Sequence, residues 1–282
     1  MKGGEANEVS LPSPLRSGSR EMGGGEANEA EPTLLPAFRL KSHLNRWVFP
    51  AGMEYVVVSV GGSIFLPADE KGIGFIKGLA DTIGGCVSQE RKIGVTVGGG
   101  TIARRYMDWG RALGCDEFTL DELGIAITRV NALMFIMGFS GYNVAPNVMQ
   151  DIPQATHMLQ SYDIVVMGGT HPGHTTDAVA AMLAEKLRAS RIVNATSVPG
   201  IFESDPKKNP HAKMFCRMRY NDLIRLLMDQ ERKAGANLPF DMLGIQLLKR
   251  SKIPLRVVDG KDLTNLKKAI RGEKFRGTEV VG

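Results

Sequence analysis

Short apolar runs that each end in glycine recur along the chain from Tyr55 onward. Runs of this length that are rich in Val and Ile are typical of buried β-strands. They cover residues 55–63, 93–100, 163–170, 192–200 and 255–260, and a shorter run at 275–282 follows a glycine at position 272. The segments between them place apolar residues three and four positions apart, which predicts helices at 73–83, 103–113, 122–139, 176–188, 220–235 and 243–251.

Strands that alternate with long helical segments predict parallel pairing through right-handed crossovers. The fold class we expect is therefore α/β, a three-layer αβα sandwich with a largely parallel central sheet. The run at 275–282 is expected to add a short last strand to this sheet, so that one domain covers residues 55–282.

Residues 1–54 differ in composition from the rest of the chain. Gly, Glu, Asn, Ser and Pro dominate there, and the hexapeptide GGEANE occurs at 3–8 and again at 24–29. Such a segment buries too little apolar surface to offset the entropy of ordering it. We predict a disordered or loosely packed low-complexity extension without chemistry of its own; a misassigned start codon is the alternative.

Composition and charge narrow the classes of protein further. No apolar run approaches the roughly 20 residues that cross a bilayer, so we expect no membrane partner. The three cysteines lie far apart and fit neither a disulfide framework nor a C-x-x-C metal site, and no apolar stretch follows Lys2 as in a signal peptide, so we expect a cytoplasmic protein. The net charge of +5 suits phosphorylated small molecules as easily as nucleic acid, but no run of five Lys or Arg occurs, and we expect no nucleic-acid partner.

Three of the predicted strands run into glycine-rich turns that precede helices, at 61–63, 98–101 and 168–170. Glycine lets backbone N–H groups approach a ligand closely, and a helix N-terminus favours an anion. One such turn is a weak signal, but turns at the carboxyl ends of parallel strands converge on one crevice. Together they predict a polyphosphate site, although neither a P-loop motif nor a G-x-G-x-x-G fingerprint is present.

The segment 168–177, with the sequence GGTHPGHTTD, is the most informative stretch of the chain. Thr175, Thr176 and Asp177 could be ordinary helix N-cap residues, or the same hydroxyls and freed amides could hold a phosphate. His171 and His174 could be metal ligands, but no third His or Cys lies near them in the sequence. We therefore predict no metal site built from protein side chains.

Further candidates follow the second glycine turn. Arg104 and Arg105 lie one turn into the predicted helix, and the offset from Gly100 favours Arg104 as the side chain that reaches back to a phosphate, although it could be a plain surface arginine. Asp121, in a polar turn, could be a helix N-cap or could accept hydrogen bonds from a ribose.

In order and spacing, five of these segments together resemble the amino acid kinase superfamily, and most closely its archaeal-type uridylate (UMP) kinase branch. They are VGGS, VTVGGGTIARRY, DELGIAITRVNA, VMGGTHPGHTTDAVAAMLAE and SDPKK, and the resemblance covers about residues 55–281. It implies an amino acid kinase-like αβα sandwich that transfers the γ-phosphoryl group of ATP to UMP, giving UDP and ADP in pyrimidine nucleotide biosynthesis. It also implies Mg²⁺ bound with the nucleotide and a homo-oligomer, generally a hexamer.

Carried over by position, the resemblance implies two sets of ligand contacts and two catalytic candidates. The residues expected to face ATP are Gly62, Ser63, Gly100, Arg104, Thr196, Phe202 and Asp205. The residues expected to hold UMP are Gly99, Asp121, Thr170, His171, Pro172, Gly173, His174, Thr175 and Thr176. Arg104 and Asp241 are the candidate catalytic residues, and Asp241 is also suited to cap the helix predicted at 243–251.

The chain departs from the pattern of the superfamily at two places. Many members have lysine where this chain has Ser59, although archaeal-type members commonly lack it too. The nucleotide segment has Pro199 and Phe202 in place of the usual Asp and Tyr, which removes a carboxylate and a phenolic hydroxyl near the base and ribose. These departures keep two alternatives open: a non-catalytic nucleotide sensor or storage protein on the same fold, and a kinase of another small phosphate or carboxylate.

Overall fold

The computed structural model describes residues 50, 52–65, 72–204, 206, 209, 211–231 and 240–282, with side chains in 229–231 left aside. All of them belong to the unit Val48–Gly282. The extension predicted at 1–54 lies almost wholly outside the described residues, and so does Asp205. Those expectations stay predictions.

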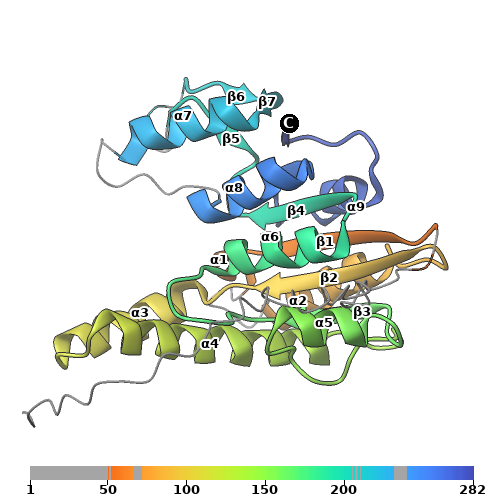
Figure 1. Ribbon diagram of the computed structural model, residues 1–282, viewed down its shortest axis with the longest axis horizontal. Coiled ribbons are helices and arrows are strands. Elements are labelled where there is room, and N and C mark those ends of the chain that lie inside the picture. Colours follow the sequence, from red (N-terminus) through yellow and green to blue (C-terminus); the bar gives the residue numbers. More distant parts are fainter. Residues whose placement is uncertain are drawn as a thin grey trace, which may run out of the picture. The chain divides into compact units, whose positions relative to one another are not determined.

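A central sheet carries the described unit (Figure 1). Within the described residues it has seven strands in the order β3-β2-β1-β4-β8-β9-β7. Five of them pair in parallel: β1 (Glu54–Val60), β2 (Arg91–Val97), β3 (Ile164–Met167), β4 (Arg191–Thr196) and β8 (Leu255–Asp259). The predicted last strand is β9 (Thr278–Val281), which pairs antiparallel with β8 and parallel with β7 (Arg217–Arg219).

Helices cover both faces of this sheet, which confirms the predicted α/β class with a largely parallel sheet. The six predicted helices correspond to α2 (Gly72–Gly84), α3 (Gly100–Ala112), α4 (Glu117–Met137), α6 (Thr176–Leu187), α7 (Tyr220–Glu231) and α8 (Met242–Ser251). The periodicity missed three shorter helices, namely α1 (Gly62–Phe65), α5 (Ile152–Met158) and α9 (Leu263–Arg271). It also missed β7 and the hairpin of β5 (Ile201–Phe202) and β6 (Met214–Phe215).

Alternation along the strands divides the core between the two faces. On β1, Tyr55 and Val57 pack with the side of α5, α6 and α8, whereas Val56, Val58 and Val60 pack with the side of α2, α4 and α9. Side chains of a strand point alternately to opposite faces, so a strand buried on both faces is apolar throughout. This is why the parallel strands read as continuous apolar runs in the sequence.

The start of α4 differs from the prediction. The helix begins at Glu117 rather than Glu122, because the Asp116 carboxylate accepts the N–H of Thr119 at 3.0 Å and caps it. Asp121 therefore lies inside the helix and is not its N-cap. The polar residues before position 122 that suggested a turn form the solvent-exposed first turn of the helix.

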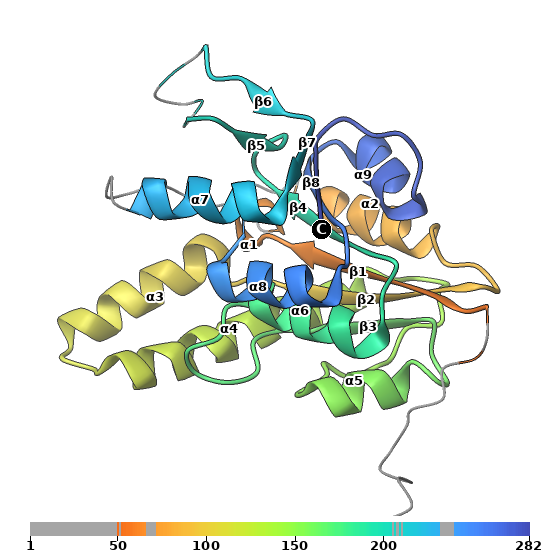
Figure 2. The same ribbon diagram turned by 45° about the horizontal axis from the view of Figure 1, so that its top comes forward.

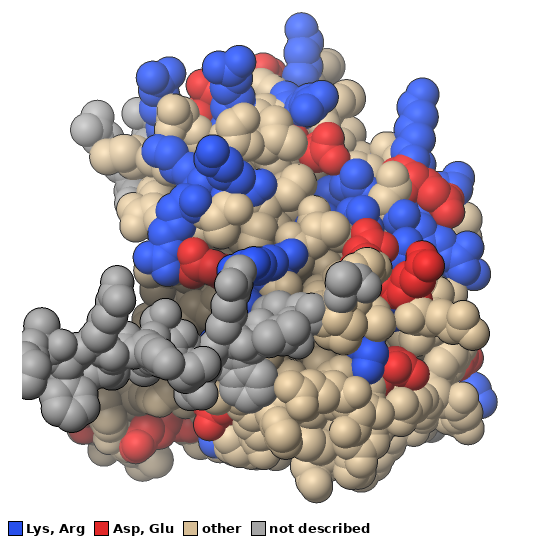
Figure 3. All heavy atoms as spheres, turned by 45° about the vertical axis from the view of Figure 1, so that its right-hand side comes forward, with Lys and Arg blue, Asp and Glu red and all other residues tan. Residues whose placement is uncertain are grey.

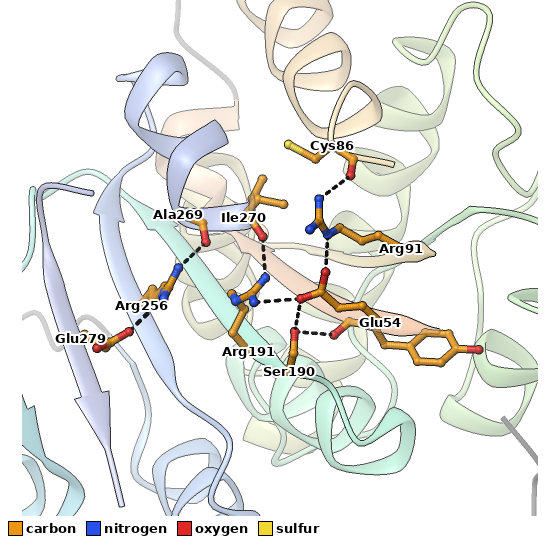
Figure 4. A network of polar contacts seen from close by, with 10 residues as sticks. Glu54, Cys86, Arg91, Ser190, Arg191, Arg256, Ala269, Ile270 and Glu279 are labelled. Atoms are coloured by element: carbon orange, nitrogen blue, oxygen red, sulfur yellow. Dashed lines mark hydrogen bonds and ion pairs between the residues drawn. The ribbon is translucent and has the colours of Figure 1, made fainter. Parts of the chain in front are cut away.

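A charged cluster joins the amino ends of the central strands, at the edge opposite the glycine turns (Figure 4). The Glu54 carboxylate lies 2.5 Å from Arg91 Nε and 2.8 Å from Arg191 Nη2, and it accepts the hydroxyl of Ser190 at 2.8 Å. Burial would raise the pKa of Glu54, but the hydrogen bonds from Arg91 and Ser190 and the charges of both arginines lower it below the ordinary value. Glu54 thus ties β1 to the strands on both sides of it.

Charge is distributed unevenly over the surface. Figure 3 shows Lys and Arg gathered over the upper part of one face, where α7, α9 and β7 lie in Figure 1, whereas the lower part of that face has few charged side chains. No helix of the described residues is long and apolar enough to span a membrane.

We predict that Glu54→Gln lowers the free energy of unfolding at neutral pH by about 1–2 kcal/mol, between the values for exposed and for buried ion pairs. Because the folded state lowers the pKa of Glu54, its contribution is present above the unfolded pKa and is lost as the pH falls through the folded one. Urea unfolding of both proteins at pH 7 and below pH 4.5 checks this.

Glu185→Gln is the matched control, since Glu185 pairs with Arg250, whose side chain is 67% exposed, and should change stability by less than about 1 kcal/mol. A Glu54→Gln effect that is equally small, or that persists unchanged at low pH, would contradict the assigned role.

Candidate active site

The three glycine turns lie together at the carboxyl edge of the adjacent strands β3, β2 and β1. A Cβ atom on Gly62 would fall 2.1 Å from the backbone nitrogen of Gly100 and 2.6 Å from the carbonyl oxygen of Gly98. A Cβ on Gly98 would lie 3.5 Å from Thr176 Oγ1, at the start of α6. The first two turns are thus in backbone contact. The start of α6, which follows the third turn, lies next to the second turn.

Polar side chains on one face of α4 form hydrogen bonds with the second and third glycine turns. Asn131 Nδ2 donates to the carbonyl oxygen of Gly98 at 2.9 Å, and Thr128 Oγ1 accepts the N–H of Gly169 at 2.7 Å. The Thr128 hydroxyl donates in turn to the carbonyl of Ile125 at 2.6 Å, so its oxygen is left to accept. Thr128 and Asn131 were not among the predicted site residues, although both lie in the segment DELGIAITRVNA and are buried polar residues in a helix.

Asp121 holds the loop that follows the third turn. Its carboxylate accepts the N–H of Gly173 at 2.7 Å, and Gly173 has a φ of +79°, where glycine is favoured. His171 and His174 are exposed beside it, with ring centroids 6.4 Å apart. Among the described residues no group of three His, Cys, Asp or Glu side chains could hold a metal ion.

Thr175 joins the starts of two helices. Its hydroxyl oxygen accepts the N–H of Ala178 at 3.1 Å and caps α6, and its hydroxyl donates to the Asp241 carboxylate. Asp241 also accepts the N–H of Gly244 at 2.8 Å, which makes it the N-cap of α8. The capping interpretations of Thr175 and Asp241 are therefore correct, and Thr176 and Asp177 form the first turn of α6.

Asp177 is the one residue of this group with a strongly shifted pKa. Burial raises the pKa of its carboxyl group to about 7, the hydrogen bond from Ser59 opposes the shift, and the negative charge of Asp241 adds to it. The buried Ser59 hydroxyl donates to Asp177 Oδ1 at 2.7 Å. Ser59 is thus a neutral partner of this carboxyl group.

The two arginines of α3 point to different partners. Arg104 Nη2 donates to Ser63 Oγ at 3.2 Å and so reaches across to the first glycine turn. The guanidinium carbon of Arg105 lies 5.2 Å from the centre of the Trp109 ring. Of the pair, Arg104 has its charge at the group of glycine turns.

The remaining predicted residues are placed less closely together. A Cβ on Gly61 would lie 3.8 Å from Thr196 Cα, so the end of β4 adjoins the first turn. Phe202 belongs to the hairpin β5–β6, which is separate from the central sheet (Figure 2). Gly99, Gly100, Thr170 and Pro172 lie in the turns and the loop described above.

Arranged in this way, the edge of the sheet combines backbone N–H groups, a helix N-terminus, guanidinium groups and the carboxyl groups of Asp121, Asp177 and Asp241. Backbone amides and guanidinium groups stabilise phosphate oxygens by charge-assisted hydrogen bonds. Aligned donors of this kind suit the transfer of a group that carries its own negative charge.

Comparisons with known proteins agree with this chemistry. Residues 54–259 match the amino acid kinase family. The uridylate kinase of Thermococcus kodakarensis is 41% identical over 225 residues, which cover 80% of this chain and 98% of that protein. The crystal structure of uridylate kinase from Archaeoglobus fulgidus superimposes with a TM-score of 0.70 at 37% identity, covering 80% of this chain and 99% of that one. The UMP kinase structure from Bacillus anthracis shares the fold, with a TM-score of 0.66 at 22% identity.

We predict that Asp177→Asn stabilises the protein, and more at pH 8 than at pH 5. The pKa of Asp177 is raised in the folded state, from 3.8 to about 7, so the folded chain holds a proton that the unfolded chain releases, and stability falls as the pH rises between these values. Asparagine cannot ionise and still accepts the Ser59 hydroxyl. Thermal unfolding at both pH values measures the difference in Tm between variant and wild type.

Asp222→Asn is the control, because Asp222 lies at an exposed position on α7 and its side chain is 54% exposed. Its difference in Tm from wild type should not change between pH 5 and pH 8. A gain for Asp177→Asn that is the same at both pH values would contradict the raised pKa.

Proposed function

Because this chain belongs to the amino acid kinase family, we propose that its group of glycine turns is the site of a UMP kinase, which transfers the γ-phosphoryl group of ATP to UMP and releases UDP and ADP. The observation that carries this conclusion is the backbone contact between the turns at Gly62 and Gly100, beside the loop at 168–177. Because of this contact, two phosphorylated ligands can bind next to each other at the carboxyl edge of the sheet.

We assign the proposed site residues to the two substrates by their positions in the family's sequence pattern. On the ATP side we propose Gly62, Ser63, Gly100, Arg104, Thr196, Phe202 and Asp205. On the UMP side we propose Gly99, Asp121, Thr170, His171, Pro172, Gly173, His174, Thr175 and Thr176. Asp121 can serve both the loop and a ribose, since a carboxylate has two oxygens and only Oδ2 bonds to Gly173.

Phosphoryl transfer asks a protein mainly to align donor and acceptor and to neutralise charge on the equatorial oxygens. Backbone amides of the first two turns aim their dipoles at the migrating group, and Arg104 adds a permanent positive charge beside Ser63. No general base is needed, because the UMP phosphate is already an anion near neutral pH. Asp241 fixes Thr175 and so sets the position of the acceptor loop.

We propose that Mg²⁺ binds together with ATP and not at a separate site formed by protein side chains. Mg²⁺ keeps several waters and is commonly held by substrate phosphates with one or two carboxylates. The described residues fit this mode, since they contain no set of three ligating side chains but place Asp177 and Asp241 near each other. When bound, the ion supplies charge neutralisation at the phosphates.

We also propose a homo-oligomer, a hexamer by resemblance, built through the outer face of α3 and α4. Four apolar side chains of α3 form a stripe with exposures of 41–84%: Ile102, Tyr106, Trp109 and Leu113. On α4, Val130, Met134 and Met137 form a second stripe, 49–70% exposed. Neighbouring apolar side chains that are exposed together mark interaction sites on a protein surface. Light scattering on Trp109→Asp, expected to give smaller particles than wild type, measures this.

A cytoplasmic location fits the cysteines. Within the described residues Cys86, Cys115 and Cys216 are all free thiols, and Cys115 and Cys216 are exposed. Reducing compartments keep such thiols unpaired.

The experiment for the function is a substrate panel. Purified protein with ATP and Mg²⁺ is offered UMP, CMP, AMP and GMP, and UDP should form well ahead of the other diphosphates. Binding of UMP without turnover would support the sensor or storage alternative instead. Failure of UMP to raise the Tm would support another acceptor, since a ligand that binds the native state stabilises it.

For the same reaction we predict that Arg104→Ala lowers kcat/KM by about 10²-fold, as loss of a charge-assisted phosphate contact does. The neighbouring Arg105→Ala is the control, because Arg105 contacts Trp109 and not the glycine turns. Steady-state kinetics with ATP and UMP compare the two variants. Equal effects of both substitutions would remove Arg104 from the site.

A further inference from the structure

Arg129 is a residue of α4 to which neither the motifs nor the proposed chemistry gives a role. Its Nε donates to the carbonyl oxygen of Gly169 at 3.1 Å, and its Nη2 donates to the carbonyl oxygen of Thr170 at 3.4 Å. The residue is partly buried, and among the described residues no carboxylate forms an ion pair with it. A guanidinium group thus binds two consecutive carbonyls of the third glycine turn and keeps its charge there.

Holding these carbonyls also fixes the direction of the next N–H groups. In a trans peptide the C=O of one residue and the N–H of the following residue point in opposite directions. With the carbonyls of Gly169 and Thr170 directed at Arg129 on α4, the N–H groups of Thr170 and His171 point away from α4. Neither N–H donates to another described residue.

Two successive N–H groups on the same side of the backbone form a concave site for an anion. The neighbouring contacts of the loop do not produce this pair. Thr128 accepts the N–H of Gly169, and Asp121 accepts the N–H of Gly173. These two N–H groups are therefore used within the protein and are not free to bind a ligand. Among the described side chains, Arg129 is the one that binds the third turn through its carbonyls and leaves its N–H donors available.

We propose that Arg129 is a positioning residue of the acceptor subsite, which directs the N–H groups of Thr170 and His171 at the phosphate of the nucleoside monophosphate and adds its own positive charge behind them. This inference rests on the proposed function, because it assigns the third turn to the acceptor phosphate. The Arg129 side chain acts through the backbone of the turn and need not touch the nucleotide itself.

The test compares Arg129→Met and Arg129→Lys in the full chain. Arg129→Met should raise KM for UMP by about 10-fold or more with KM for ATP changed less than about 2-fold, since the carbonyls lose their donors on the acceptor side only. Arg129→Lys keeps the charge but lacks the planar fork, and should restore part of the loss. Arg250→Met is the matched control, because Arg250 also makes two hydrogen bonds, to Glu185, but lies at the end of α8.

A purely structural role would raise both KM values together or lower Tm without moving the ratio of the two, and either result overturns the proposal. So does an unchanged KM for UMP in Arg129→Met. A second measurement separates this inference from the proposed function. Amide hydrogen exchange of the free protein should speed up in Arg129→Met at Gly169, whose N–H is bound by Thr128, and stay as in wild type at Gly98, whose N–H is bound by the carbonyl of Val60.

If wild type makes no UDP, the proposed function fails. The exchange measurement then still tests whether Arg129 positions the third turn. Exchange at Gly169 that is equal in both proteins overturns the positioning whatever the activity.

Discussion

Two backbone turns approach each other closely at one edge of the sheet, and the arrangement of the site follows from this contact. Gly62 and Gly100 leave no room for a Cβ atom between them, and Gly100 has a φ of +65°. Parallel pairing of β1 with β2, in register from Glu54 to Val60, puts both turns at the same height. Backbone donors can then face one set of phosphates from two sides, which side chains on longer stems would not do as rigidly.

Helix α4 is the second element that the site needs. Asp121, Thr128 and Arg129 lie on one face of it, and each binds a different part of the loop at 168–175. The loop therefore takes its shape from a helix and not from its own sequence alone. At the opposite edge of the sheet, Glu54 links three strands by charge, so the frame is held at the end away from the chemistry.

Asp177 lowers the stability of the fold at neutral pH, although it lies beside the proposed site. A carboxyl group with a pKa near 7 at the start of α6 is an unfavourable choice for folding at neutral pH, and a neutral residue would be easier to bury. Its place between Ser59 and Asp241 puts this cost directly beside the proposed phosphate site.

The fold class, the six longer helices, the parallel strands and the three glycine turns could be predicted from the sequence, because hydrophobic periodicity and turn chemistry are local properties. The sequence also separated Arg104 from Arg105 by offset alone. The binding of Gly173 by Asp121, and of the turns by Thr128, Arg129 and Asn131, depends instead on the tertiary structure. These are contacts between residues 33 to 52 positions apart, which arise only when the sheet has placed the turns beside the helix. The short helices α5 and α9 escaped the pattern because nine residues or fewer give too few repeats of a helical period.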